Sequence, residues 1–346
     1  MNIIDLFSGV GGLSLGFEKA GFKTIAAVDV WEDAIKTYNH NHTKKTGIAI
    51  DIATFNKEIL PNLSTNTKID GVIGGPPCQG FSSARLSDNG DEINKINENR
   101  NKLYIDFFET VKKTKPSFFL IENVRGMAAR NDGAFIKDIQ LRFGSIGFKI
   151  NFKVLNASDY GVPQNRHRVF IVGLKKNLFD FPILQKEKVS SHDALSDLPT
   201  NEYADKLDYP CSPLNDYQKL MRHNSKFIFN HEITSHSEQT IKIISLIPDG
   251  GSIKSLPDSF WKVRKFNKAF QRMNSSLPSL TIDTGHRNYF HYKENRVPTV
   301  REAARLQSFP DSFAFLGSKT SQYKQVGNAV PPLLAFEIAK RIKVHL

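Results

Sequence analysis

Ile3-Ile-Asp-Leu-Phe-Ser-Gly-Val-Gly-Gly-Leu-Ser-Leu-Gly-Phe-Glu-Lys-Ala20 has the pattern of a strand, a tight turn and a helix. The apolar run Ile3 to Phe7 is typical of a buried strand, and Leu13, Phe17 and Ala20 share one helical face. The glycines between them let the backbone approach a ligand, and the helix N-terminus offers free N–H groups. The stretch therefore predicts the first unit of an open α/β sheet.

The pattern repeats downstream. Strand-like runs are expected at 24–28, 47–50, 69–73, 117–121 and 169–174, and several alternate with helical segments such as 31–39. This alternation predicts a doubly wound, mostly parallel sheet. Acidic residues end three of the runs, at Asp29, Asp51 and Glu122, which places them at the ligand-binding edge of such a sheet.

Asp29 follows the glycine turn by the usual distance for a carboxylate that binds ribose hydroxyls. The turn departs from G-x-G-x-x-G, so these residues alone fit NAD, FAD or S-adenosylmethionine. A nicotinamide oxidoreductase is therefore one of the functions that the first strands leave open.

A second strand end carries Gly74-Gly-Pro-Pro-Cys-Gln-Gly-Phe-Ser82. Pro76 and Pro77 restrict the backbone before Cys78, and Gly80 permits unusual dihedral angles after it. This placement favours a nucleophilic cysteine, with a small buried apolar side chain as the alternative. The polar residues 82–101 that follow predict a long loop.

Composition excludes several classes of protein. The chain has 346 residues, enough for one large α/β domain and a smaller one. Its two cysteines, Cys78 and Cys211, form neither a disulfide framework nor a zinc site. No apolar run reaches a membrane span and the N-terminus lacks a basic stretch, so we expect no signal peptide and a cytoplasmic location.

Charge points to a polyanionic partner. The net charge is +12, and residues 254–305 carry 11 Lys and Arg against 4 Asp and Glu. Phe260, Trp261, Phe266, Phe270, Tyr289, Phe290 and Tyr292 are interleaved with them. Basic residues mixed with planar rings favour nucleic acid over a membrane surface. The composition also shifts after residue 174, so we expect a catalytic domain at 1–174, an irregular domain at 175–276 and a return segment at 277–346.

Six motifs occur in one order along the chain. They are the turn Asp5–Gly12, Pro76-Pro77-Cys78, Glu122-Asn123-Val124, Gln164-Asn-Arg166-His-Arg168, Arg301-Glu302-Ala-Ala-Arg305-Leu-Gln-Ser-Phe-Pro310 and Gln325-Val-Gly-Asn328-Ala-Val330-Pro-Pro332. In this combination the chain closely resembles the DNA (cytosine-5-)-methyltransferases of bacterial restriction–modification systems, outside the variable stretch at about 175–276. The resemblance implies an S-adenosylmethionine-dependent, Rossmann-like fold in which that stretch is the target recognition domain.

The resemblance also implies the catalytic roles. Cys78 would add to carbon-6 of a flipped-out cytosine, which is covalent catalysis by an activated thiolate. Glu122 would donate a proton to ring nitrogen 3, with an N-cap or a salt bridge as its structural alternative. Arg168 would hold the flipped base and Arg166 would support the active-site loop or nearby phosphates. The two arginines alternate, so we expect them on one face of an extended segment, and a structural ion pair with Glu122 is compatible with that.

Two ligand sets follow in the same way. The cofactor-binding set is Phe7, Ser8, Gly9, Gly11, Gly12, Leu13, Asp29, Val30, Asp51, Ile52, Pro76, Leu103, Asn328 and Val330, and it implies that the last helix packs beside the first strand. The DNA-binding candidates are Ser82, Arg85, Arg100, Lys262, Arg264, Lys265, Lys268, Arg272 and Arg287. The cofactor is S-adenosyl-L-methionine, with S-adenosyl-L-homocysteine as product and no metal.

The remaining expectations concern partners and rivals. Arg301, Glu302 and Arg305 have helical spacing in Val300–Leu306, and we expect an ion-paired structural helix rather than a DNA contact. The resemblance implies double-stranded DNA as the substrate, and we expect a monomer and a restriction endonuclease that acts on the same site without stable contact. The alternatives are a tRNA cytosine-5 methyltransferase and a non-catalytic DNA-binding homologue.

Overall fold

The structure is a computed structural model that describes residues 1–77, 103–129, 133–183, 187–200, 206–263, 270–285 and 289–346. The chain forms two compact units. The first comprises residues 1–156, 167–183 and 335–346, and the second comprises residues 157–166 and 184–334. The second unit is thus longer than the expected 175–276, because it takes in ten residues before β7 and most of the expected return segment.

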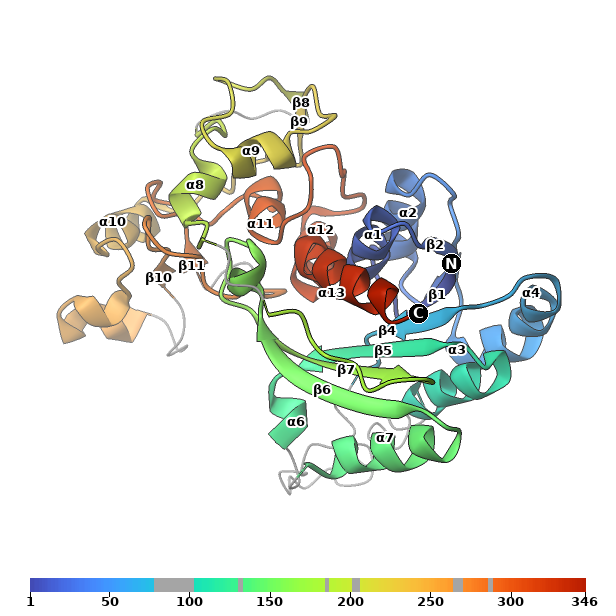
Figure 1. The fold of residues 1–346 in the computed structure, drawn as a ribbon. Coiled ribbons are helices and arrows are strands. Elements are labelled where there is room, and N and C mark those ends of the chain that lie inside the picture. Colours follow the sequence, from blue (N-terminus) through green and yellow to red (C-terminus); the bar gives the residue numbers. More distant parts are fainter. Residues whose placement is uncertain (78–102, 130–132, 184–186, 201–205, 264–269, 286–288) are drawn as a thin grey trace. The chain divides into compact units, whose positions relative to one another are not determined.

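A seven-stranded sheet forms the centre of the first unit, in the order β3-β2-β1-β4-β5-β7-β6 (Figure 1). The strands are β1 (Asn2–Leu6), β2 (Lys23–Asp29), β3 (Gly47–Ala49), β4 (Gly71–Gly74), β5 (Phe118–Val124), β6 (Lys149–Asn156) and β7 (His167–Leu174). Neighbouring strands pair in parallel along the part of the sheet ordered β3-β2-β1-β4-β5. Strand β7 runs antiparallel to both β5 and β6. The expected doubly wound, mostly parallel sheet is therefore confirmed.

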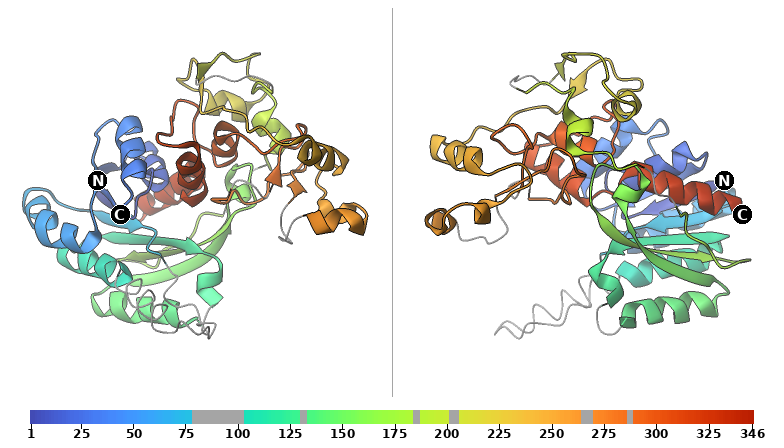
Figure 2. Two further views of the ribbon diagram at one scale, coloured as in Figure 1. Left: turned by 180° about the vertical axis from the view of Figure 1, so that it is seen from behind. Right: turned by 60° about the vertical axis from the view of Figure 1, so that its left-hand side comes forward.

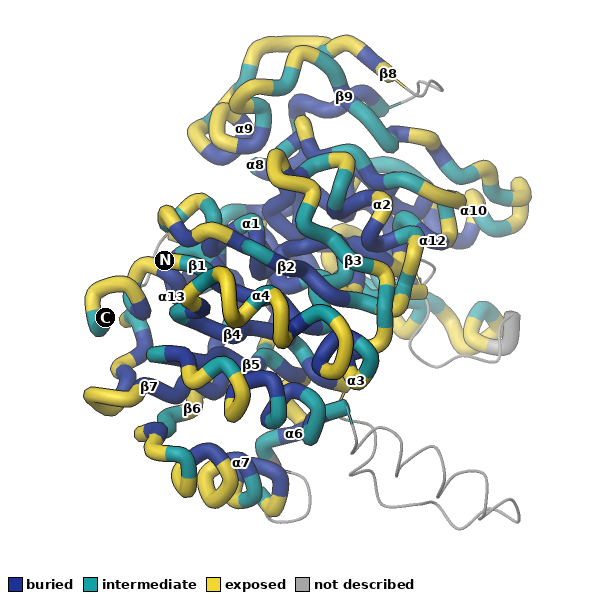
Figure 3. Tube along the Cα trace, turned by 90° about the vertical axis from the view of Figure 1, so that its right-hand side faces the viewer, coloured by how far each residue is buried: buried dark blue, intermediate teal, exposed yellow. Residues whose placement is uncertain are grey.

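Helices cover both faces of this sheet. One face packs against α3 (Ile52–Thr54), the π-turn η1 (Phe55–Ile59), α4 (Leu60–Asn66), the helical residues 103–114, α6 (Gly126–Ala129) and α7 (Ala134–Ser145). Buried aromatic rings fill this layer, and the ring centroids of Phe119 and Phe143 lie 4.2 Å apart. Figure 3 shows the central strands as the most continuously buried part of this unit.

The other face carries α1 (Gly12–Lys19), with Phe17 stacked on Phe118 of β5. The last helix, α13 (Pro332–Val344), returns to this unit and lies beside α1 (Figure 2). The Lys343 ammonium donates to the Ala20 carbonyl at 3.0 Å, and Lys19 lies over the Phe336 ring. The C-terminal helix α13 therefore packs against the N-terminal part of the unit, as the last motif implied.

The second unit is built from short elements. They are η4 (Ala157–Tyr160), α8 (Ser191–Leu195), β8 (Lys206–Leu207), α9 (Asp216–Met221), β9 (Ile228–Phe229), α10 (Glu238–Leu246), η5 (Ile253–Ser255), η6 (Asp258–Val263), β10 (Gln271–Arg272), β11 (Tyr289–Phe290), α11 (Val300–Leu306) and α12 (Lys319–Asn328). These elements are short, and polar contacts between them help to hold them in place.

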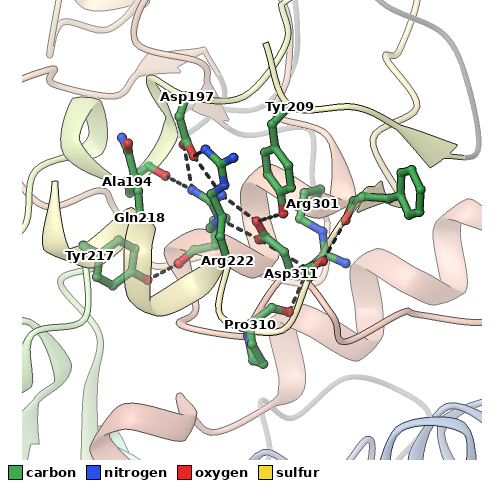
Figure 4. A network of polar contacts seen from close by, with 12 residues as sticks. Ala194, Asp197, Tyr209, Tyr217, Gln218, Arg222, Arg301, Pro310 and Asp311 are labelled. Atoms are coloured by element: carbon green, nitrogen blue, oxygen red, sulfur yellow. Dashed lines mark hydrogen bonds and ion pairs between the residues drawn. The ribbon is translucent and has the colours of Figure 1, made fainter. Parts of the chain in front are cut away.

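A buried ion network lies in this unit (Figure 4). Arg305 of α11 bonds Asp197 at 2.9 Å and Asp311 at 2.6 Å, and all three side chains are excluded from solvent. Arg301 donates to the carbonyls of Pro310 and Phe313. Removing one partner of such a network leaves a buried charge uncompensated, at a typical cost of ~3–5 kcal/mol.

The α11 helix is therefore structural, as expected, but its partners differ from the expected neighbours. Spacing suggested pairs within the helix, whereas Glu302 binds Arg296 at 2.7 Å and Arg305 binds acids outside the helix. The reason is burial: the helix is enclosed on all sides, so its charged side chains reach other elements instead of lying along a solvated face.

None of the helices in the described ranges is long and apolar enough to cross a membrane.

Candidate functional site

The glycine turn follows β1 and begins α1. Phe7 has φ 57°, Gly9 has φ 53° and Gly11 has φ 86°, all in the left-handed region that favours glycine. The Ser8 amide donates to the Val28 carbonyl at 3.1 Å, which ties the turn to β2. A Cβ built on Gly9 would meet nothing within 4 Å, so this part of the turn borders open space. Such a turn is suited to close approach of a ligand.

Asp29 ends β2 beside this turn. Its carboxylate oxygens accept the Gly9 amide at 2.8 Å and the Trp31 amide at 2.9 Å. Burial raises the pKa of Asp29 above its ordinary value, and the amide hydrogen bonds partly oppose that shift. Each oxygen keeps a second lone pair, so the carboxylate can still accept hydroxyl groups. Val30, next in the chain, is exposed.

The following strand end carries Asp51 and Ile52. The Asp51 carboxylate caps α3 by accepting the Thr54 amide at 2.9 Å. The hydrogen bond from the Thr54 hydroxyl lowers the pKa of Asp51. Ile52 is buried, whereas Leu103 is half-buried at the first described residue of helix 103–114. The structure therefore places the turn, Asp29 and Asp51 on three neighbouring strand ends of one sheet.

Asp5 lies in the quoted motif, but sequence reasoning gave its side chain no role. Its side chain is fully buried, and Oδ2 accepts the Ser14 hydroxyl at 2.6 Å. Burial raises the pKa of Asp5 to about 7. An acid inside an apolar strand is the sequence signal that could have identified it.

We expect this carboxyl group to make stability depend on pH. Between about pH 4 and pH 7 the folded chain keeps a proton on Asp5 that the unfolded chain has lost. The wild-type free energy of unfolding should therefore fall as pH rises through this window, by about 4 kcal/mol at most. The Asp5→Asn variant should lack this slope. Urea unfolding of both proteins at pH 4 to pH 8 measures it, with exposed Asp51→Asn as control. Parallel wild-type and Asp5→Asn curves would contradict the prediction.

The turn that leads to Cys78 follows β4. Gly74 must be glycine, because a Cβ there would lie 2.1 Å from the Leu6 carbonyl oxygen of β1. The Asn123 side chain donates to the Pro76 carbonyl at 2.7 Å in a buried contact. Asn123 therefore holds the Pro-Pro turn, a role that sequence reasoning did not give it. Cys78 itself lies just outside the described residues.

Glu122 lies beside the same turn. A Cβ on Gly75 would stand 3.1 Å from Glu122 Oε2. The Glu122 carboxylate pairs with the Arg168 guanidinium at 3.1 Å between Oε1 and Nε, and both side chains are largely buried. Glu122 is inside β5 and not after it, since the strand continues to Val124. The expected ion pair is thus present.

Arg166 departs from the expectation. It belongs to the second unit and is 2% exposed, and it donates to the carbonyls of Ile282 at 2.9 Å and Gly327 at 2.8 Å. Arg168 belongs to the first unit. Strand β7 begins between the two arginines, at His167. Arg166 fixes the backbone of the last motif, where Gly327 lies.

That last motif ends α12. Asn328 is exposed and Val330 is buried. Gly327 permits close packing, because a Cβ there would lie 2.5 Å from the Asp283 carbonyl oxygen. Within the second unit, Arg166 and Gly327 thus present Asn328 to solvent from a fixed backbone, which suits a polar ligand contact.

The DNA-binding candidates have different outcomes. Ser82, Arg85, Arg100, Arg264, Lys265, Lys268 and Arg287 lie outside the described residues, as does the side chain of Lys262. Arg272 needs correction: it is buried, and its guanidinium donates to the carbonyls of Ile247 at 2.8 Å and Ile244, at the end of α10. It fixes that helix end and is not exposed to phosphate.

Some of the aromatic residues near Arg272 are buried, as Arg272 itself is. Phe270 and Phe290 pack with Ile243, Ile244 and Ile247 in a small hydrophobic cluster, whereas Trp261 is exposed. An antiparallel bridge joins Ser252 to Gln271, and Ile253, Leu256 and Phe260 between them also pack against the cluster. Part of the basic, aromatic stretch is therefore the core of the second unit.

The geometry limits the chemistry that these residues support. No group of three or more His, Cys, Asp or Glu suited to a metal was found in the described ranges. The open turn at Gly9, the Asp29 carboxylate and exposed Val30 fit a nucleoside-containing cofactor with ribose hydroxyls. Glu122 adds an acid–base group beside Gly75, at the start of the Pro-Pro turn.

Comparisons with known proteins agree with this arrangement. The family model for C-5 cytosine-specific DNA methylase matches residues 1–344. The type II methyltransferase M1.HphI of Haemophilus parahaemolyticus is 37% identical over 99% of this chain and 86% of its own length. Type II methyltransferase M.DdeI of Desulfomicrobium norvegicum is 38% identical over 99% and 88%. A solved structure of an E. coli prophage-encoded protein, described as a DNA modification methyltransferase, superposes with TM-score 0.82, at 30% identity and 99% coverage of both chains.

Proposed function

We propose that this chain, which belongs to the C-5 cytosine-specific DNA methylase family, methylates cytosine by covalent catalysis through Cys78. The family assignment makes the protein a DNA (cytosine-5-)-methyltransferase of the type found in restriction–modification systems. The observation that supports the mechanism best is the position of Glu122, whose carboxylate lies against Gly75 of the turn before Cys78. Nucleophile and proton donor would then act on one ring from neighbouring strand ends.

The turn and the adjacent strand ends would bind the methyl donor. The Phe7–Leu13 backbone and the Asp29 carboxylate would hold the ribose and methionine parts, with Val30, Asp51 and Ile52 around the adenine. Pro76, Leu103, Asn328 and Val330 complete the proposed set. When bound, S-adenosyl-L-methionine supplies an electrophilic methyl group to carbon-5 and leaves as S-adenosyl-L-homocysteine.

The chain's own residues would make carbon-5 reactive. The Cys78 thiolate would form a bond to carbon-6 while nitrogen 3 takes a proton from Glu122, so the double bond shifts from carbons 5 and 6 to carbons 4 and 5 and forms an enamine. After methylation, a base would remove the proton from carbon-5, the carbon–sulfur bond would break, and nitrogen 3 would return its proton to Glu122, which restores the thiolate and the aromatic ring. Arg168 would orient Glu122 through the ion pair that the structure contains.

Sequence recognition would belong to the second unit. Cytosine inside a duplex cannot reach Cys78, so the base must be flipped out while neighbouring base pairs are read in the major groove. We place specificity within about 175–295, and the protein would act as a monomer. Methylation would protect host DNA from an endonuclease that cuts the same sequence.

A methyl-transfer assay tests the proposal directly. The full chain is incubated with S-adenosyl-L-methionine labelled in its methyl group and with either a random-sequence duplex or tRNA. We expect label in duplex DNA, on the cytosines of one short sequence, and no label in tRNA. Label in tRNA alone would favour the RNA enzyme, and no label in either would favour a non-catalytic homologue.

A further inference from the structure

Two stacked rings on α2 (Glu32–Asn41) and just after it press against the glycine turn. The rings of Tyr38 and His42 are parallel within 6°, with centroids 3.8 Å apart. A Cβ on Gly11 would lie 2.4 Å from His42 Nε2 and 2.5 Å from Tyr38 Cε2. Gly11 therefore contacts both rings through its bare α-carbon, and the turn cannot move toward α2 without displacing them.

Polar contacts hold each ring in place. His42 Nδ1 lies 2.9 Å from the Glu18 carboxylate of α1. The Tyr38 hydroxyl lies 3.5 Å from the Thr46 hydroxyl, ahead of β3. Both ring side chains are buried, so neither is free to change rotamer without opening a cavity. The pair thus joins α1, α2 and the segment before β3.

The last helical turn of α2 also holds the start of β3, which leads to the part of the proposed cofactor site that would bind adenine. Asn39 donates to the Gly47 carbonyl at 2.9 Å and accepts the Gly47 amide at 2.8 Å. A Cβ on Gly47 would lie 3.0 Å from the Tyr38 ring. Since β3 pairs with β2 from Gly47 and leads to Asp51, the position of α2 determines the spacing between the two halves of the site.

We propose that Tyr38 and His42 are positioning residues for the methyl donor: they set the Gly9–Gly12 turn against the strand end at Asp51 without touching the ligand. This inference rests on the proposed cofactor. If it holds, loss of either ring lets the turn shift, which weakens cofactor binding. The chemical step depends on Cys78 and Glu122 and should be unaffected once cofactor is saturating.

Calorimetric binding of S-adenosyl-L-homocysteine and steady-state kinetics on a duplex substrate test this with the full chain. Tyr38→Ala and His42→Ala should each raise the Kd and the KM for the cofactor about tenfold or more, with kcat within about twofold of wild type. Tyr38→Phe and His42→Phe keep the ring and should stay within about threefold. His40→Ala, at an exposed histidine on the same helix, is the matched control and should not change either constant.

Three results overturn the inference. They are a folded alanine variant that binds with wild-type Kd, a variant in which kcat falls while KM is unchanged, and an effect of His40→Ala equal to that of His42→Ala. If an alanine variant does not fold, Tyr38→Leu and His42→Leu keep the space filled without a ring, and wild-type affinity in them overturns it equally. A wild-type protein that binds no S-adenosyl-L-homocysteine refutes the cofactor assignment itself, which is a distinguishable outcome.

Discussion

We expect the Cys78→Ser variant to lose methyl transfer to duplex DNA while it keeps its affinity for cofactor and DNA. A serine hydroxyl is a far weaker nucleophile than a thiolate at neutral pH, so addition to carbon-6 would fail and carbon-5 would stay unreactive. The turn itself should persist, because Asn123 holds it through the Pro76 carbonyl and not through the cysteine. Transfer of labelled methyl groups and calorimetric cofactor binding measure the two properties separately.

The second cysteine supplies the matched control. Cys211 is exposed in the second unit, and Cys211→Ser should methylate at the wild-type rate. A duplex with fluorine at carbon-5 of the target cytosine should trap a stable adduct with wild type and Cys211→Ser, since fluorine cannot leave as the proton does. Turnover by Cys78→Ser near the wild-type rate, or no adduct with wild type, would rule out the covalent mechanism.

Glu122→Gln should slow methyl transfer by ~10²–10⁴-fold, the usual contribution of a general acid–base group. An amide keeps the shape and can still contact Arg168, but it cannot deliver a carboxylic proton to nitrogen 3. The rate of a single turnover at saturating cofactor and DNA measures the chemical step without product release.

A half-buried glutamate outside the proposed site gives the comparison for this variant. Glu109 in helix 103–114 pairs only loosely with Lys112, at 3.8 Å, and Glu109→Gln should leave the single-turnover rate unchanged. A loss of less than roughly tenfold in Glu122→Gln, which corresponds to about 1.4 kcal/mol, would make the ion pair with Arg168 structural rather than catalytic.

The sequence predicted the sheet well where apolar runs end at a glycine or an acid. Strands β1, β2, β4 and β7 lie within a few residues of their expected positions because each is buried on both faces. Strand β6 (Lys149–Asn156) was not predicted. It lies at the sheet edge, and its sequence alternates apolar and polar residues, which is a strand pattern but gives no continuous apolar run.

Buried arginines were the main source of error in the site. In a sequence, Arg272 looks like the other basic residues of its stretch, yet its partners are carbonyl oxygens that no pattern reveals. Arg166 likewise donates to the carbonyls of Ile282 and Gly327, contacts that no sequence pattern reveals. The neighbourhood of Asp29 and the glycine turn was predictable because the end of a parallel strand has a fixed place in such a sheet.

The return of α13 to the first strands has a consequence for synthesis on the ribosome. Residues 1–156 cannot complete their compact unit until residues 335–346 have emerged, because the Lys343 contact with Ala20 closes it last. Domains usually fold as soon as their residues are available, from the N-terminus onward. Here the first unit must wait for the whole second unit to be translated. A nascent chain that lacks residues 335–346 is therefore expected to be unable to methylate DNA.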